Sequence, residues 1–281
     1  MGTSEENEAG SSGDIIAQAA RHWAREKLHF LECYAPAFVN ACRRAEGGCF
    51  IDAFAGPGWN KDEQGRFRGS PLIAIEYDFH RLFFIDNDPL NIRSLRALDL
   101  GQRATVMEGD ANELVLEALQ GVPTWLPALI FLDQNSNQVS YSTLREIAQW
   151  SQARDRKPEL LILLPTGMAL QRFFPVGRRT QCPDVLTRVF GSEDAWRPIE
   201  EQRMAGGLQR SSLIQALTER YGRLLQADLG YQPKPIHRHI RMDGESGIWL
   251  YTLVFATDHP VGRQVMEECF RHRQSGQGTL F

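Results

Sequence analysis

Hydrophobic residues near the start of the chain recur at the spacing of a helix. From Asp14 to Val39 an apolar side chain returns every three or four positions, and Pro36 interrupts the pattern. Such spacing places the apolar side chains on one face of a helix, and a proline inside the helix kinks it. We therefore predict a helical extension over residues 14–46, in two segments.

The two ends of the chain lack such a pattern. Residues 1–13 are mainly Gly, Ser and Glu, and residues 274–281 form a polar stem that ends in two apolar residues. Segments with so few apolar side chains cannot offset the entropy that is lost on ordering. We expect both ends to be flexible tails that flank a single domain over residues 14–273.

From residue 49 onward, short apolar segments alternate with segments of helical spacing. Alternating strands and helices are typical of a parallel sheet with helices on both faces. The expected helices begin near Ser70, Pro89, Ala111 and Ser140. The expected strands cover residues 49–54, 82–85, 104–108, 129–133 and 160–164.

The pattern changes after the fifth expected strand. Residues 166–210 are polar and rich in arginine, and we expect them to form an insertion on the substrate side. A helix over 213–225 follows, and then two strands that the turn 243–247 joins into a hairpin. The prediction is an α/β fold with a mostly parallel, seven-stranded sheet and a C-terminal antiparallel hairpin.

Two glycines, Gly56 and Gly58, follow the first expected strand. They let the backbone pass close to a ligand, and Asp52 at the strand end can accept a hydrogen bond from an amino group. Phe54 lies between Asp52 and the glycines. A dinucleotide-binding loop would continue to a third glycine at the start of a helix, but Trp-Asn-Lys follows at 59–61. The loop therefore favours a cofactor without a pyrophosphate.

Acidic residues also follow the next two expected strands. Asp86, with Asn87 beside it, ends the second strand, where a carboxylate can bind a ribose diol. Asp110 and Ala111 follow the third strand, where a carboxylate can bind an adenine amino group. Each acid alone is equally well explained as a helix N-cap. Together with the glycine loop and the hairpin, these acids predict a Rossmann-like class I methyltransferase fold with S-adenosylmethionine as cofactor.

The chain resembles the family of three-Cys-motif partner proteins. The resemblance implies the methyltransferase fold, an activity that is largely unassigned, and a radical-SAM-like three-Cys-motif protein as partner. It rests on residues 22–23, 26–28, 31–34, 51–56, 69–72, 84–86, 109–111, 131–133, 142–143 and 165–169.

The loop after the fourth expected strand is where a methyl acceptor would bind. It supplies Asp133, Asn135 and Gln138 as candidate catalytic residues, and Tyr141 is the nearest aromatic. Members of the resembled family usually have Asp-Pro, an aromatic and Gly here, so this chain keeps Asp133 and Gln138 but lacks the Pro and the Gly. A carboxylate or amide can polarise the amino group of a base that stacks on an aromatic ring. A polar loop that caps the next helix explains the same residues equally well.

Basic residues near the glycine loop and after the fifth strand are candidates for substrate binding. Lys61, Arg66 and Arg68 lie in the insertion 59–69, and Arg172 opens an arginine-rich stretch with interspersed aromatics. Arginines beside aromatics suit a nucleic-acid groove. Acidic residues occur in the same stretch, so a salt-bridged surface is an equal alternative.

Composition narrows the class of protein. The five cysteines are scattered without a Cys-x-x-Cys pair, and we interpret them as reduced thiols. A net charge of -4 provides no global basic field. No apolar run approaches the length of a membrane span, and the sequence predicts a cytoplasmic protein. His237 and His239 share a strand face without a recognisable third ligand, so no metal site is predicted.

The C-terminal residues Gln277, Leu280 and Phe281 resemble the short peptide that docks on bacterial sliding clamps. The alternative is a tail that packs its two apolar residues on its own domain.

The leading hypothesis is a methyltransferase that acts on DNA or RNA, paired with a radical-SAM-like protein. The alternative is a methyltransferase-fold protein that methylates nothing and binds a radical-SAM enzyme or a sliding clamp, as an accessory in DNA repair. Whether the chain is an enzyme stays open, and the sequence favours one.

Overall fold

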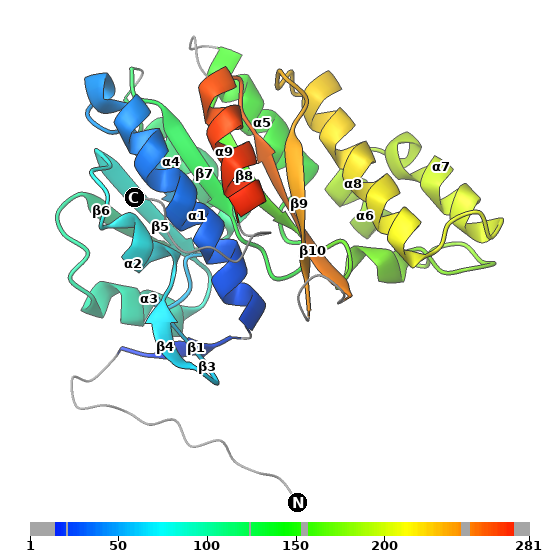
Figure 1. The fold of residues 1–281 in the computed structure, drawn as a ribbon, viewed down its shortest axis with the longest axis horizontal. Coiled ribbons are helices and arrows are strands. Elements are labelled where there is room, and N and C mark those ends of the chain that lie inside the picture. The colour runs from blue at the N-terminus through cyan, green and yellow to red at the C-terminus, as the bar shows by residue number, and fades with distance from the viewer. Residues whose placement is uncertain (1–14, 21, 124, 153–156, 243–247, 273–281) are drawn as a thin grey trace, which may run out of the picture.

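The computed structural model describes residues 15–20, 22–123, 125–152, 157–242 and 248–272. The two predicted tails and the predicted hairpin turn at 243–247 lie outside these residues, as do the clamp-motif residues Gln277, Leu280 and Phe281. The described residues form an α/β structure around one seven-stranded sheet (Figure 1).

The strand order of the large sheet is β6-β5-β2-β7-β8-β10-β9. Within this sheet β2, β5, β6, β7 and β8 pair in parallel, whereas β10 is antiparallel to both β8 and β9. This arrangement confirms the predicted Rossmann-like class I methyltransferase fold. The strands are β2 (Cys49–Asp52), β5 (Arg81–Asp86), β6 (Ala104–Glu108), β7 (Ala128–Leu132), β8 (Glu159–Leu164), β9 (Ile236–Arg241) and β10 (Trp249–Ala256).

Helices cover both faces of this sheet. Because side chains alternate along a strand, Phe50 and Ile51 of β2 enter different hydrophobic clusters on the two sides. One face is covered by α1 (His22–Ala41), α2 (Ser70–Ala74), α3 (Pro89–Ala97) and α9 (Pro260–His272). The other face is covered by α4 (Ala111–Gln120), α5 (Tyr141–Gln152), α6 (Pro183–Phe190), α7 (Glu193–Met204) and α8 (Arg210–Ala227).

The N-terminal extension differs from the prediction. Residues 17–19 are a strand, β1 (Ala17–Ala19), and the helix that follows runs from residue 22 to 41 with Pro36 inside it. β1 pairs in parallel with β3 (Trp59–Asp62), which forms a hairpin with β4 (Gly65–Arg68). Helical periodicity could not reveal this strand because its partner lies about forty residues further along the chain. The insertion after the glycine loop is therefore a hairpin that holds the N-terminal strand beside the loop.

A disulfide joins Cys33 of α1 to Cys269 of α9, with the two Cα atoms 6.0 Å apart. This corrects the interpretation of all five cysteines as reduced thiols. The two residues are 236 positions apart, so the sequence gives no local sign that α1 and α9 pack side by side (Figure 1). Cys42, Cys49 and Cys182 form no disulfide.

Candidate functional site

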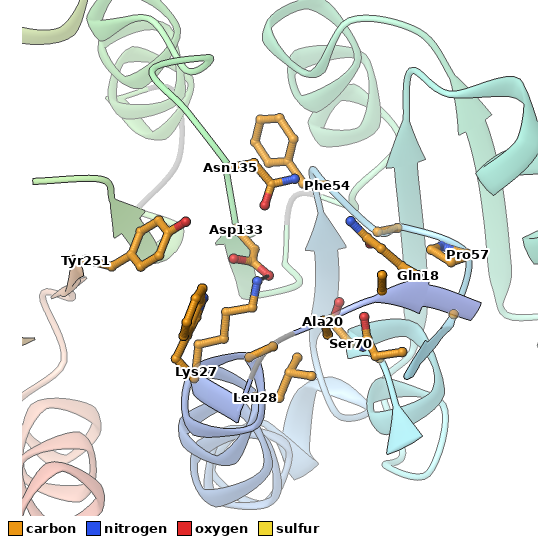
Figure 2. Close-up of a pocket in the computed structure, with 17 residues that line it drawn as sticks. Gln18, Ala20, Lys27, Leu28, Phe54, Pro57, Ser70, Asp133, Asn135 and Tyr251 are labelled. Carbon is orange, nitrogen blue, oxygen red and sulfur yellow. Dashed lines mark ion pairs between the residues drawn. The ribbon is translucent and has the colours of Figure 1, made fainter. Parts of the chain in front are cut away.

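A cavity of about 260 Å³ opens beside the glycine loop, at the carboxyl end of β2 and β7 (Figure 2). Ligands of open α/β sheets bind at this edge of the sheet. Its walls come from β1, from the first turns of α1, from the loops after β2 and β7, and from β10. Among the lining residues are Gln18, Trp23, Lys27, Phe54, Pro57, Gly58, Asn60, Ser70, Asp133, Asn135 and Tyr251.

Asp52 ends β2 immediately before the loop residues that line the cavity. Its carboxyl group is fully buried: Oδ1 accepts a hydrogen bond of 3.2 Å from the Phe54 amide, and Oδ2 has no partner among the described residues. Burial raises the pKa of Asp52 to about 7, with the Ser70 hydroxyl opposing the shift and the Asp133 carboxylate adding to it. The protein therefore contains, at the end of β2, a buried acid whose Oδ2 accepts no hydrogen bond from the described residues.

Asp133 follows β7 and points into the cavity (Figure 2). Its Oδ2 lies 2.6 Å from Nζ of Lys27 on α1, and its Oδ1 has no partner among the described residues. Burial raises the pKa of Asp133, and the ammonium group of Lys27 opposes that shift. Sequence reasoning assigned no role to Lys27, although Glu-Lys-Leu at 26–28 belongs to the family resemblance.

The glycine loop is fixed to the neighbouring strand. Gly56 and Gly58 both have positive φ, at 62° and 87°, and a Cβ at Gly58 would lie 2.5 Å from the Leu98 side chain. The Gly56 amide donates a 2.8 Å hydrogen bond to Oδ2 of Asp86. Asp86 thus positions the loop from the end of β5, while the adjacent Asn87 is exposed.

The acid after β6 caps a helix in this structure. Asp110 accepts a 2.8 Å hydrogen bond from the Asn112 amide as the N-cap of α4, and Ala111 is the first residue of that helix. Neither Asp86 nor Asp110 lines the cavity. Their roles toward a ribose and an adenine stay predictions.

The loop after β7 is held by its own amide side chains. Gln134 Oε1 accepts hydrogen bonds from the amides of Gln138 and Val139, at 2.8 and 2.9 Å. Gln138 Oε1 accepts a 3.1 Å bond from the Asn135 amide. Gln138 therefore bonds within the loop and does not line the cavity, whereas Asn135 does. These bonds fix a loop that lacks the proline of the resembled family.

Tyr141 is not near the cavity, which corrects its selection as a substrate-stacking residue. It is buried on the other side of the sheet, and its hydroxyl donates to the Leu224 carbonyl at 3.1 Å. The aromatic side chains of the cavity are Trp23, Phe54 and Tyr251. They come from α1, the loop after β2, and β10, which are far apart in the sequence, so no local pattern could bring them together.

The basic residues of the β3–β4 hairpin divide into two groups. Arg68 forms ion pairs with Glu32 and Glu76, which reduces its availability to a substrate. Lys61 and Arg66 are exposed, and the Arg66 guanidinium lies 4.4 Å from the centre of the Trp59 ring. Arg172, in the 3₁₀ turn Leu170–Phe173, is also exposed.

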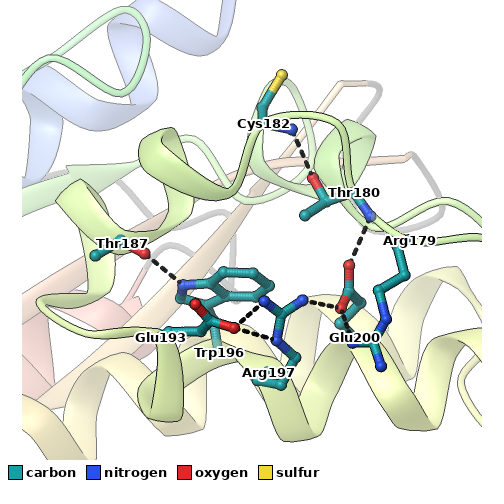
Figure 3. A network of polar contacts seen from close by, with 8 residues as sticks. All are labelled: Arg179, Thr180, Cys182, Thr187, Glu193, Trp196, Arg197 and Glu200. Atoms are coloured by element: carbon teal, nitrogen blue, oxygen red, sulfur yellow. Dashed lines mark hydrogen bonds and ion pairs between the residues drawn. The ribbon is translucent and has the colours of Figure 1, made fainter.

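Part of the arginine-rich stretch is a structural network (Figure 3). The side chain of Glu200 is fully buried and accepts hydrogen bonds from Arg179 at 2.9 Å, Arg197 at 2.6 Å and the Thr180 amide at 2.6 Å. The neighbouring Trp196 is fully buried as well. For Arg179 and Arg197 the salt-bridged alternative is therefore the correct one, since both guanidinium groups bind a buried carboxylate.

The residues that the structure describes contain no group of three His, Cys, Asp or Glu side chains placed to hold a metal ion. No helix among them is long and apolar enough to cross a membrane.

Comparison with solved structures supports the fold. A Legionella pneumophila protein, LPL1258 of the family DUF519, superimposes with a TM-score of 0.50 at 11% identity, covering 95% of each chain. Human methyltransferase-like protein 13 in complex with SAH gives a TM-score of 0.42 at 11% identity, covering 93% of this chain and 96% of that one. TYW2 of M. jannaschii in complex with AdoMet gives a TM-score of 0.37 at 13% identity, covering 84% of this chain and 76% of that one. At such identities only the fold is shared, and of these three matches only that to LPL1258 reaches a TM-score of 0.50.

No protein-family model matches the sequence, and no curated protein matches it either. Membership of the three-Cys-motif partner family therefore stays a prediction.

Proposed function

We propose that this chain binds S-adenosylmethionine at the cavity and transfers its methyl group to an amino group of a base in DNA or RNA. The observation that carries the proposal is the pair of buried carboxylate oxygens without partners, Oδ2 of Asp52 and Oδ1 of Asp133. An unpaired buried acceptor is costly, so both oxygens favour a ligand that brings N–H donors and positive charge.

The residues present fit the cofactor. Its α-ammonium and sulfonium groups suit a site that has Asp133 in its lining and the buried acid Asp52 at the end of β2, immediately before the lining residues of the glycine loop. In this proposal Asp52 binds the ammonium group, and the Gly56–Gly58 backbone allows close approach. Asp86 would bind the ribose, and Asp110 would accept a hydrogen bond from the adenine amino group.

When bound, the cofactor supplies an electrophilic methyl group on its sulfonium sulfur. Asp133 and Asn135 accept hydrogen bonds from the amino group of the base and so direct the nitrogen lone pair. The nitrogen would gain the methyl group as the methyl carbon–sulfur bond breaks, leaving S-adenosylhomocysteine as the neutral thioether, and would lose one proton, for which the Asp133 carboxylate is the acceptor at hand. Tyr251 and Phe54 provide aromatic surfaces for a flat ring.

The finer hypotheses on partners rest on sequence alone. A radical-SAM-like three-Cys-motif protein is proposed from the family resemblance. Binding to a sliding clamp is proposed from Gln277, Leu280 and Phe281, outside the described residues. Loss of clamp co-elution after deletion of residues 277–281 would support that binding.

The methyl acceptor is tested by incubating the protein with tritium-labelled S-adenosylmethionine and single-stranded DNA, duplex DNA or RNA. We expect label in one class of nucleic acid, and mass spectrometry of its nucleosides should show a methyl group on an exocyclic amine. Cofactor binding without label in any nucleic acid would contradict the proposed reaction. That result would favour the alternative of a partner protein that methylates nothing.

A further inference from the structure

Lys27 reaches the candidate catalytic loop from outside the large sheet. It lies in the second turn of α1, and its ammonium group contacts Asp133 at 2.6 Å with 17% of the side chain exposed (Figure 2). It is the one cationic side chain among the described residues that line the cavity. Among the described lining residues, the positive charge therefore comes from the N-terminal extension.

When the proposed function operates, one group requires that charge and another must be released from it. The amino-acid part of S-adenosylmethionine carries a carboxylate, and an anion in a cavity beside Asp52 and Asp133 needs a cationic partner. Asp133 has to present its oxygens to the amino group of the acceptor. While Lys27 occupies Oδ2, only Oδ1 of Asp133 is without a partner.

We propose that Lys27 exchanges partners when the cofactor binds. It pairs with Asp133 in the ligand-free protein and with the cofactor carboxylate in the loaded protein, which releases Oδ2 of Asp133 to the acceptor. Lys27 is thus a positioning residue that makes acceptor binding depend on cofactor binding. The inference rests on the proposed function, since it requires S-adenosylmethionine in this cavity.

The chemistry of a lysine suits such an exchange. Its ammonium group is a compact charge at the end of a flexible four-carbon stem, with three donors that serve oxygens in different directions. A bidentate arginine pair would hold a single carboxylate more firmly.

The test compares S-adenosylmethionine with its decarboxylated analogue, which lacks only the carboxylate. Calorimetry gives the ratio of the two dissociation constants, and in this ratio the contribution of the shared sulfonium cancels. We expect the wild-type chain to bind S-adenosylmethionine about 10-fold more tightly than the analogue. In Lys27→Met the ratio should fall to about 1, and in Lys27→Arg it should be partly retained. In Asp133→Asn it should rise above the wild-type value, because Lys27 then has no competing carboxylate.

Arg44→Met is the matched control, since it also removes one positive charge but from an exposed residue after the far end of α1. Its ratio should equal that of the wild type. Methylthioadenosine, which lacks the amino-acid part, should bind wild type and Lys27→Met equally, and this reports an intact site. A wild-type ratio in Lys27→Met, or a lower ratio in Asp133→Asn, would overturn the partner exchange while leaving the proposed function standing. If wild type binds no S-adenosylmethionine, both fail together.

Discussion

Replacing Asp133 with asparagine is expected to slow methyl transfer by about 100-fold or more while S-adenosylmethionine still binds. The substitution keeps the shape of the side chain but leaves one acceptor oxygen and removes the group that takes the proton. The effect should appear in kcat, because the acceptor amino group needs the carboxylate as the carbon–nitrogen bond forms. Single-turnover rates with labelled cofactor, on the nucleic acid that accepts methyl groups, measure it.

Asp184→Asn serves as the matched control for this substitution. Asp184 is an exposed carboxylate in the first turn of α6 and does not line the cavity, so the same chemical change should leave kcat at the wild-type value. Equal rates for wild type and Asp133→Asn would exclude Asp133 from the reaction and assign the Lys27–Asp133 pair to structure alone.

Asp52 is expected to make the stability of the protein fall as pH rises from about 4 to about 7. The unfolded chain releases this proton near pH 3.8, whereas burial raises the folded pKa to about 7. Between these values the folded state binds more protons than the unfolded state, so the free energy of unfolding decreases with pH. Between pH 5 and pH 8 the titration of Asp52 should lower the free energy of unfolding by about 3 kcal/mol.

The measurement is urea unfolding of wild type and Asp52→Asn at pH 5 and pH 8. Asparagine does not titrate, so the free energy of unfolding of the variant should lack this decrease. Relative to wild type it should be about 3 kcal/mol higher at pH 8 than at pH 5. Other groups titrate in both proteins and largely cancel in the difference. The same pH dependence in both proteins would show that Asp52 is not buried as an unpaired acid.

A bound ammonium group should also favour the ionised form of Asp52, so the affinity for S-adenosylmethionine should rise with pH up to about 7.

The sheet could be predicted from sequence because its signals are local. Each parallel strand is a short apolar run, and the residues that follow it, such as Asp52, Asp86 and Asp133, meet at one edge as a result of the parallel arrangement. The glycine loop was recognisable for the same reason, since positive φ at Gly56 and Gly58 requires glycine in the sequence itself.

Other features depend on contacts between distant segments. Lys27 lies more than one hundred positions before Asp133, and Cys33 lies 236 positions before Cys269. No local pattern encodes either pair. Tyr251 lines the cavity more than one hundred positions after Asp133, and no local pattern indicates that β10 lies beside the loop after β7.

The arginine-rich stretch shows a different limit. Glu200 and Glu201 are adjacent and chemically identical, yet Glu200 is fully buried and Glu201 is exposed. Burial of one carboxylate determines which arginines, Arg179 and Arg197, are bound inside the protein. A sequence pattern that mixes both charges cannot separate a groove for nucleic acid from such a network.

The central claim, that the cavity is a site for S-adenosylmethionine, is tested most directly by calorimetry. We expect one site per chain with a dissociation constant on the order of 10 μM. S-adenosylhomocysteine should bind more weakly, because it lacks the sulfonium charge that the carboxylates favour. Asp86→Ala should weaken binding by about 10-fold or more, through loss of a charged acceptor and of the bond that positions Gly56. No heat of binding with either compound, for a wild-type protein shown to be folded, would contradict the account.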